Sequence, residues 1–266
     1  MNEVLPTEKE VLLASMTTVD AQQRLSDAVA IIPIGAVEQH GPHLPLDTDI
    51  YLSTQVALAA AAQVTVAAFV CPPLPIGVSE HHMRFAGTLS LRHDTLFAVV
   101  HDVVMSLTAH GCLRIVLLNG HGGNSTLIAR AAQDLGLATS ARIVSLNYWS
   151  MARNAVAQTR RSEPNGMAHG GEFETSLMLH LRPSAVRSDA IATCVPEPRI
   201  ADESFDLFGT SPFVMGFRTE ELSPTGVIGR PDLATAENGA DWFTAAVDGC
   251  SNLVSELANS ATKPGE

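Results

Sequence analysis

The chain has 266 residues, of which 46% are hydrophobic and 17% charged, and its formal net charge is −12. This composition is typical of a globular protein with a substantial core and excludes an intrinsically disordered chain. The excess of acidic residues argues against nucleic acids and anionic membranes as partners, because both require basic surfaces.

The cysteines and the first residues of the chain indicate a reducing compartment. The four cysteines show no CxxC spacing, which favours reduced thiols over a disulfide framework or a zinc ribbon: Cys71, Cys112, Cys194 and Cys250. Acidic residues interrupt the first ten positions, unlike the pattern of a signal peptide. Apolar runs reach strand length, so no membrane span is predicted. We therefore expect a cytoplasmic protein.

Apolar, β-branched runs alternate with helical patterns along most of the chain. Strands are predicted over residues 28–34, 64–70, 114–118 and 142–146. Helices are predicted over residues 50–62, 95–109 and 172–181, from residue 125 onward and from about residue 234 onward. Residues 183–232, rich in Pro, Gly, Ser and charge, predict loops and short elements over one edge. The pattern favours an α/β fold with a mostly parallel sheet covered on both faces, in a single domain over residues 1–266.

Histidines and carboxylates gather where these strands end. In an open α/β sheet, ligands bind just beyond the carboxyl ends of the strands. Six of the ten histidines fall in four such segments, and packing alone does not explain this concentration: His40, His43, His81, His82, His121 and His169. The strand ends are therefore the predicted functional site.

The segment after the first strand offers a metal-binding set. Glu38 and His40 are two residues apart, so in an extended segment they point to the same side. Asp49 can return to that place after two proline turns, and its carboxylate can bridge two ions. Oxygen and imidazole ligands together suit zinc, manganese or iron. The alternative is that Asp49 caps the following helix, and we expect His43 and Asp47 to be structural.

A glycine-rich segment, NGHGGN, follows the third strand. Its glycines allow the backbone to approach a ligand closely and present His121 at the strand end. A phosphate-binding loop is the alternative, but the segment lacks both the P-loop lysine and GxGxxG spacing. His121 therefore belongs with the other candidate residues at the strand ends.

The last of the four segments begins at His169. His169 and Glu172 are three residues apart and share a face if a helix already starts there. We expect Glu172 to bind metal while His169 faces the substrate. The alternative is that Glu172 is simply a favourable acidic residue in the first helical turn. Glu174 points elsewhere on the helix and is expected to make a structural hydrogen bond.

Other residues are candidates for substrate binding. Ser79, His81 and His82 belong to a segment predicted to line a pocket. Trp149 can stack on a flat substrate or pack in the core. The remaining histidines have helix or turn contexts and are expected to be structural: His93, His101, His110 and His180.

The phrases that carry these residues resemble the creatininase (creatinine amidohydrolase) family. They are IPIGAVEQHGPHLPLDTD (32–49), GTLSL (87–91), LLNGHGGN (117–124), NYW (147–149) and HGGEFETSLML (169–179), with a weaker match at SPTGVIGRPDLAT (223–235). The resemblance implies a three-layer α/β/α fold, a homo-oligomer (hexamer) and two divalent ions per subunit, Zn²⁺ or Mn²⁺ with Fe²⁺ possible. It implies that Glu38, Asp49 and His121 hold one ion, that His40 and Asp49 hold the other, and that His169 is catalytic.

The chain also departs from creatininase itself. Creatininase has a metal-binding glutamate two residues after the histidine of the third segment, where this chain has Gly123. We expect Glu172 to replace it. Creatininase has a glutamate and a tryptophan where this chain has Ala168 and Asn165. These departures argue against creatinine as the substrate.

The resemblance implies hydrolysis of a carbon–nitrogen bond other than a peptide bond, in a small amide. We expect a hydroxide activated by two metals to attack the carbonyl, and His169 to protonate the leaving nitrogen. Related alternatives are a formamide deformylase and a peptide-trimming hydrolase. A single-zinc hydrolase using His40 and His121, or a non-catalytic metal-stabilised protein, is the competing interpretation. Specificity is expected in residues 79–84, 149–168 and 195–230.

Overall fold

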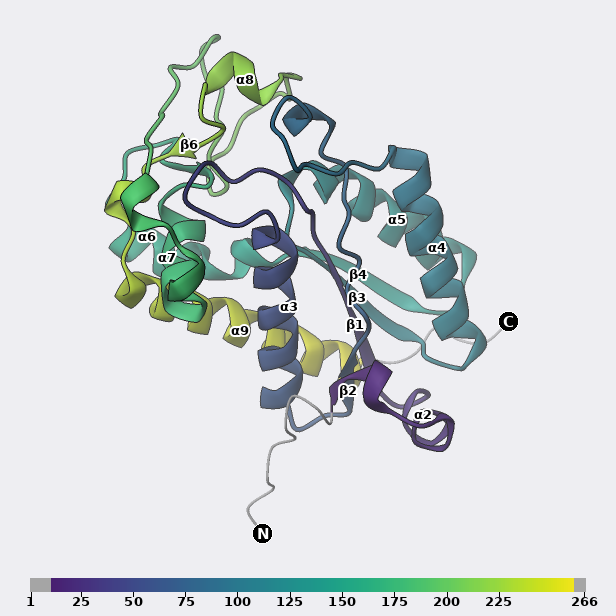
Figure 1. Cartoon of the computed structure of the whole chain (residues 1–266). Helices are drawn as coiled ribbons and strands as arrows, with labels where there is room; N and C mark the ends of the chain where they lie inside the picture. Colours follow the sequence, from purple (N-terminus) through teal and green to yellow (C-terminus); the bar gives the residue numbers. More distant parts are fainter. Residues whose placement is uncertain (1–10, 261–266) are drawn as a thin grey trace.

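Four parallel strands form the central sheet of the computed structural model, which describes residues 11–260. Their order across the sheet is β2-β1-β3-β4 (Figure 1). The strands are β1 (Val29–Ile34), β2 (Ala68–Val70), β3 (Arg114–Asn119) and β4 (Arg142–Asn147). The alternating apolar runs thus produce the predicted parallel sheet, and both of its faces are buried.

Helices cover both faces of this sheet (Figure 1). Successive strand side chains point to opposite sides: Val29 and Ile31 join one core cluster, whereas Ala30 and Ile32 join the other. The first face carries α3 (Thr48–Gln63), α7 (Glu172–Leu181) and α9 (Ala236–Asn259), and the second carries α4 (His93–Ala109) and α5 (Ser125–Ala138). The predicted three-layer α/β/α arrangement is confirmed.

Several elements differ from the prediction or were not anticipated. The second strand begins at Ala68, because α3 continues to Gln63 and residues 64–67 return the chain to the sheet. Two short helices and an antiparallel strand pair are additional: α2 (Thr18–Arg24), α6 (Arg153–Thr159), β5 (Met167–His169) and β6 (Ile228–Gly229). All four are short, so their sequence periodicity is weak.

Residues 183–232 contain loops and short elements, as expected. The ordered pieces are η5 (Pro183–Ala185), η6 (Ser188–Ala190), α8 (Thr219–Leu222), β6 and η7 (Pro231–Leu233). Figure 1 shows α8 and β6 above the end of the sheet where the strands finish. The other 3-10 turns are η1 (Leu13–Ser15), η2 (Glu80–His82), η3 (Gly122–Asn124) and η4 (Tyr148–Ala152).

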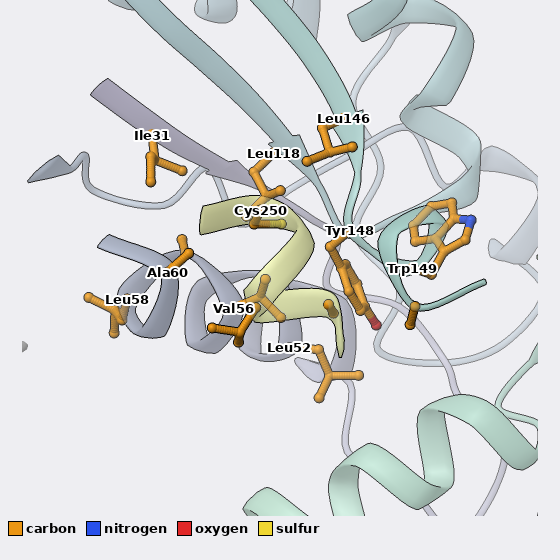
Figure 2. Close-up of a cluster of buried hydrophobic side chains, with 14 of the residues drawn as sticks. Ile31, Leu52, Val56, Leu58, Ala60, Leu118, Leu146, Tyr148, Trp149 and Cys250 are labelled. Atoms are coloured by element: carbon orange, nitrogen blue, oxygen red, sulfur yellow. The ribbon is translucent and has the colours of Figure 1, made fainter. Parts of the chain in front are cut away.

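One core cluster extends from the sheet to the carboxyl ends of its strands (Figure 2). Tyr148 is buried within it, and the Trp149 ring meets the Tyr148 ring edge to face at 5.6 Å. Figure 2 shows Trp149 at the margin of the cluster. The apolar core therefore ends at the place where the candidate site begins.

No helix within residues 11–260 is both long and apolar enough to cross a membrane. The single domain expected over residues 1–266 stays a prediction, and its first ten and last six residues lie outside the described range.

Candidate metal centre

The register of the sheet brings three loops together. Ile34 of β1 lies beside Asn119 of β3, which lies beside Asn147 of β4. Glycine follows β1 and β3, and each is needed for close packing: a Cβ on Gly35 would lie 2.6 Å from the Ile50 backbone. Gly120 has the same constraint, 2.4 Å from the Asp49 carbonyl oxygen. These glycines let the first turn of α3 approach the strand ends.

Four of the predicted ligands meet there. Glu38, His40, Asp49 and His121 are all at most 3% exposed. His121 Nδ1 lies 3.2 Å from Glu38 Oε1 and 3.1 Å from Asp49 Oδ2. His40 Nε2 lies 2.9 Å from Asp49 Oδ1. Residues from the loop after β1, from α3 and from the loop after β3 thus converge on one point.

Asp49 stands between two groups of side chains. Its Oδ1 faces His40, and its Oδ2 faces His121. The residue belongs to the first turn of α3, whose N-cap is Asp47, and no side-chain cap is formed there. The geometry therefore favours a bridging carboxylate over the helix-cap alternative.

The structure corrects the expectation for Glu172. Both of its carboxylate oxygens accept hydrogen bonds from backbone N–H groups, 2.9 Å from Arg161 and 2.8 Å from Ser162. Glu174 points to the centre instead, with Oε1 3.9 Å from His40 Nε2 and Oε2 accepting the Gly170 N–H. The two residues lie about 200° apart around the helix, so only one of them can face the strand ends.

Donor atoms of the metal-binding type gather in three overlapping groups. Within each group all atoms lie within 4.8 Å of one another: Glu38, His82 and His169; His40, His169 and Glu174; and Glu38, His40 and Asp49. The donor atoms of Glu174 therefore lie at the centre, where the sequence analysis expected those of Glu172.

The two imidazoles next to Asp49 turn towards it the ring nitrogen that is not engaged by a backbone carbonyl. His40 Nδ1 lies 3.1 Å from the Glu38 carbonyl oxygen, and His121 Nε2 lies 2.9 Å from the Val78 carbonyl oxygen. A carbonyl only accepts hydrogen bonds, so each of these nitrogens carries the proton. This outward N–H···O=C bond is the usual support of a metal-ligating histidine.

The buried carboxylates at the centre favour positive charge on the histidines beside them. Burial alone would lower the pKa of His40, but Asp49, Glu174 and Glu38 outweigh it and raise that pKa to about 10. Burial would also lower the pKa of His121, but the carboxylates of Glu38 and Asp49 outweigh it and raise that pKa well above its usual value. Burial raises the pKa of Glu174 to about 7, although His40 opposes this. Without metal, the carboxylates thus hold extra protons on the histidines.

The residues present fit divalent metal ions. Within residues 11–260, Glu38 Oε1, Glu38 Oε2 and Asp49 Oδ2 are buried without a hydrogen-bond partner. The lone pair of His121 Nδ1 faces Asp49 Oδ2 at 3.1 Å, and the two repel unless a proton or cation lies between them. Two ligands of a tetrahedral ion, each about 2.1 Å from it, lie ~3.4 Å apart. Mixed carboxylate and imidazole donors suit zinc, manganese or iron.

His169 lies at the open side of this centre. Its Nε2 donates to the Gln39 carbonyl oxygen at 2.6 Å, and its Nδ1 lies 3.7 Å from Glu38 Oε1. Burial and the charge of His40 lower the pKa of His169 to about 3. The resting imidazole is therefore neutral, with a proton-accepting nitrogen facing the carboxylates.

A cavity of about 780 Å³ opens above the centre. Asp49, His121, His169 and Glu174 line its floor. The wall includes side chains from the segment before α8 and one from α8 itself: Phe205, Leu207, Val214, Met215, Phe217, Arg218 and Glu221. These positions fall within residues 195–230, where the sequence predicted specificity.

Three of the four predicted substrate-binding residues line this cavity. They are His81, His82 and Trp149. Ser79 lies behind His121 instead: it is fully buried, with Oγ 3.5 Å from His121 Nε2. His93 also lines the cavity, although the sequence indicated a structural role. It begins α4, and only the folded chain shows that this helix starts beside the site.

The extra glutamate of creatininase has no equivalent space here. A Cβ on Gly123 would lie 2.4 Å from both His121 Nε2 and the Val78 carbonyl oxygen.

His43 and Asp47 support the site from outside, as expected: His43 Nε2 lies 2.9 Å from Thr175 Oγ1, and Asp47 pairs with Arg182 at 2.9 Å.

Known proteins share the sequence over most of its length. The chain is 34% identical over 227 residues to a mycofactocin precursor peptide peptidase of Mycobacterium ulcerans, covering 83% of this chain and 82% of that protein. It is 30% identical over 266 residues to a creatinine amidohydrolase of Pseudomonas putida, covering 93% of this chain and 97% of that protein.

Solved structures of creatininase share the fold. A manganese form matches with a TM-score of 0.79, and a Zn–Zn form of a mutant matches with 0.78. Both are 29% identical, and the match covers 94% of this chain and 99% of each creatininase chain. The family profile described as creatininase (creatinine amidohydrolase) matches residues 14–254. The chain therefore belongs to the creatininase family, and the two relatives above are named as hydrolases of carbon–nitrogen bonds.

Proposed function

We propose that this chain hydrolyses an amide bond of a small molecule at a centre of two divalent metal ions. The observation that carries the proposal is the position of Asp49, whose two buried oxygens face two different sets of donors. Glu38, Asp49 and His121 would hold one ion. His40, Asp49 and Glu174 would hold the other, so that Asp49 bridges them. This arrangement favours two ions over the single-zinc alternative.

The metals and the protein have separate tasks. When bound, two divalent ions polarise a carbonyl and lower the pKa of water to roughly 7. The protein orients the amide and moves protons. His169 accepts a proton from water at Nδ1, the nitrogen left free by its bond to the Gln39 carbonyl oxygen. It then returns this proton to the leaving nitrogen, because an amine leaves poorly unless protonated.

The cavity supports a substrate larger than creatinine. Binding pockets of about 300–1,000 Å³ bury drug-sized ligands, and this one measures about 780 Å³. Its wall is largely apolar and aromatic, with Arg218 and Glu221 at its rim. A second candidate function follows from the same observation, namely trimming of a peptide. The 34% sequence identity to a mycofactocin precursor peptide peptidase also supports this alternative.

The test uses protein loaded separately with zinc and with manganese. Each form is incubated with creatinine, other lactams, formamides and short peptides, and products are identified by mass spectrometry. We expect a gain of one water or a released amine, abolished by EDTA. In His169→Ala, turnover should fall by at least about 10²-fold, the usual contribution of a general acid, with two ions retained. Unchanged turnover in His169→Ala would exclude the assigned role.

A non-catalytic role is the remaining alternative. It predicts two bound ions, but no turnover of any amide by either metal form. A cytoplasmic location and a hexameric assembly stay predictions from the sequence and the resemblance. Size-exclusion chromatography with light scattering tests the assembly.

A further inference from the structure

Four histidine rings surround the candidate metal centre, and three of them share one arrangement. His40, His121 and His169 each donate a ring N–H to a backbone carbonyl oxygen, at 3.1, 2.9 and 2.6 Å respectively. The remaining nitrogen of each neutral ring then carries a lone pair. All three turn that lone pair towards the carboxylates.

His82 is arranged in the opposite way. Its Nδ1 lies 2.9 Å from Gln39 Nε2 and 2.9 Å from Thr219 Oγ1. An amide nitrogen only donates hydrogen bonds, so Nδ1 must accept. The ring proton is consequently on Nε2, which lies 3.3 Å from Glu38 Oε1.

Two backbone groups set the orientation of the Gln39 amide. Its Oε1 accepts the Gly41 N–H at 2.8 Å, and its Nε2 donates to the Gly226 carbonyl oxygen at 3.0 Å. Reversing the amide would place donor against donor and acceptor against acceptor at both contacts. The backbone thus fixes the amide, and the amide fixes the ring.

We propose that Gln39 is a positioning residue that holds His82 with its Nε2–H directed at the centre, where His82 donates a hydrogen bond to the amide oxygen of the substrate. The inference rests on the proposed function. His82 lines the cavity, and its ring lies 4.3 Å from the His169 ring. The acceptor of His169 and the donor of His82 are therefore side by side. His169 transfers the proton, and His82 donates a hydrogen bond to the oxygen that gains negative charge.

The proposal separates His82 from the metal ligands. Glu38, His82 and His169 offer donor atoms within 4.8 Å of one another, but a nitrogen that carries a proton cannot bind metal. His82→Ala should therefore retain two ions per chain. Its kcat should fall by about 10²–10³-fold, the effect of removing one oxyanion donor. His82→Gln, which can supply an amide N–H, should recover part of that loss.

Gln39 acts through His82, so its effect is visible in the ring itself. Gln39→Glu replaces the donor with a carboxylate, which should draw the ring proton to Nδ1 and leave a lone pair facing Glu38. We expect kcat to fall at least about tenfold. Thr219→Val is the matched control. It removes the other Nδ1 contact and keeps the amide, so the proton should stay on Nε2.

The decisive experiment is ¹⁵N spectroscopy of zinc-loaded protein with labelled histidine rings. The His82 signals are identified by their loss in His82→Gln. We expect an unprotonated Nδ1 and a protonated Nε2 in the wild type and in Thr219→Val, with the reverse in Gln39→Glu. A protonated Nδ1 in the wild type would overturn the proposal even if Gln39→Glu does not fold. So would loss of a metal ion in His82→Ala.

These results are distinguishable from failure of the proposed function. The proposed function fails if the loaded wild type cleaves no amide, whatever the ring shows. The present inference fails on the ring proton or the metal content, whatever the activity. If the ring is as expected and the enzyme is active, an unchanged kcat in His82→Ala also overturns it.

Discussion

The floor of the cavity consists of buried or nearly buried side chains close to strand ends, whereas its wall consists of half-buried and exposed side chains from residues 205–221. The floor comprises Asp49, His121, His169 and Glu174, with the fully buried Glu38 and His40 beside them. The wall comprises Phe205, Leu207, Val214, Met215, Phe217, Arg218 and Glu221. Asp49 is 2% exposed, and Val214 is 100% exposed. One region is fixed by the sheet register, and the other by contacts among loops.

This difference indicates a division of labour. The floor depends on glycines that permit close backbone packing, so its geometry tolerates little change. The wall is held by part-buried contacts between loops, such as those of the Arg199 side chain, which pairs with Glu203 and lies over the Phe217 ring. Loops on a rigid scaffold accept substitution more readily. Within one family, the floor can preserve amide hydrolysis while the wall changes the substrate.

The largest expected effect follows from removing the bridge in the floor. Asp49→Ala should lose both metal ions and all hydrolysis, because both sets of ligands share this carboxylate. Metal content per chain by atomic emission spectroscopy measures the loss. Retention of two ions would show that Asp49 is not the bridge and that the two sets are independent.

A second prediction compares two glutamates on one helix. Glu174→Gln should lose one ion and at least about 10²-fold in rate, a loss of the size that general acid–base groups produce. Glu172→Gln should keep both ions but lower the free energy of unfolding by about 1–3 kcal/mol, since charged hydrogen bonds to backbone amides are lost. Metal content and urea unfolding of both variants decide the matter. The opposite result would restore Glu172 as the ligand.

The same two residues show how far sequence reasoning can go. The strands, the main helices and the convergence of Glu38, His40, Asp49 and His121 follow from apolar periodicity and from the rule on strand ends. The choice between Glu172 and Glu174 does not. It depends on how the helix is rotated about its own axis, and tertiary packing sets that rotation.

Contacts distant in sequence account for the other differences. Trp149 and His81 were expected at the pocket, and they line it. The role of His93 depends on where α4 begins relative to the site. The orientation of His82 depends on Gln39 and Gly226, which are 187 residues apart. No local pattern encodes such a contact.

A smaller effect is expected from the wall. Val214 lines the cavity and is fully exposed, so Val214→Asp should leave the stability and metal content unchanged. An apolar substrate that covers this side chain should bind up to about tenfold more weakly, because burying a valine contributes roughly 1.5 kcal/mol. Steady-state kinetics should show the change in KM. Val19→Asp, at a 57% exposed position on α2, is the control, and an equal effect there would refute the assignment.

The smallest effect concerns the pH dependence of the floor's support. His43 is buried beneath it, and its Nε2–H donates to Thr175, whose hydroxyl donates to the Gly170 carbonyl oxygen. Burial and the charge of His40 lower the pKa of His43 to about 4. The unfolded chain, with a pKa near 6.5, therefore binds more protons between these values. The stability from His43 is complete above pH 6.5 and is lost as the pH falls towards 4.

His43→Gln keeps a donor for Thr175 but cannot take up a proton. Its free energy of unfolding in EDTA should therefore fall less than that of the wild type between pH 6.5 and 4. The other buried histidines titrate in both proteins, so the difference between the two curves isolates His43. Parallel curves would mean that the pKa of His43 is not lowered in the folded protein.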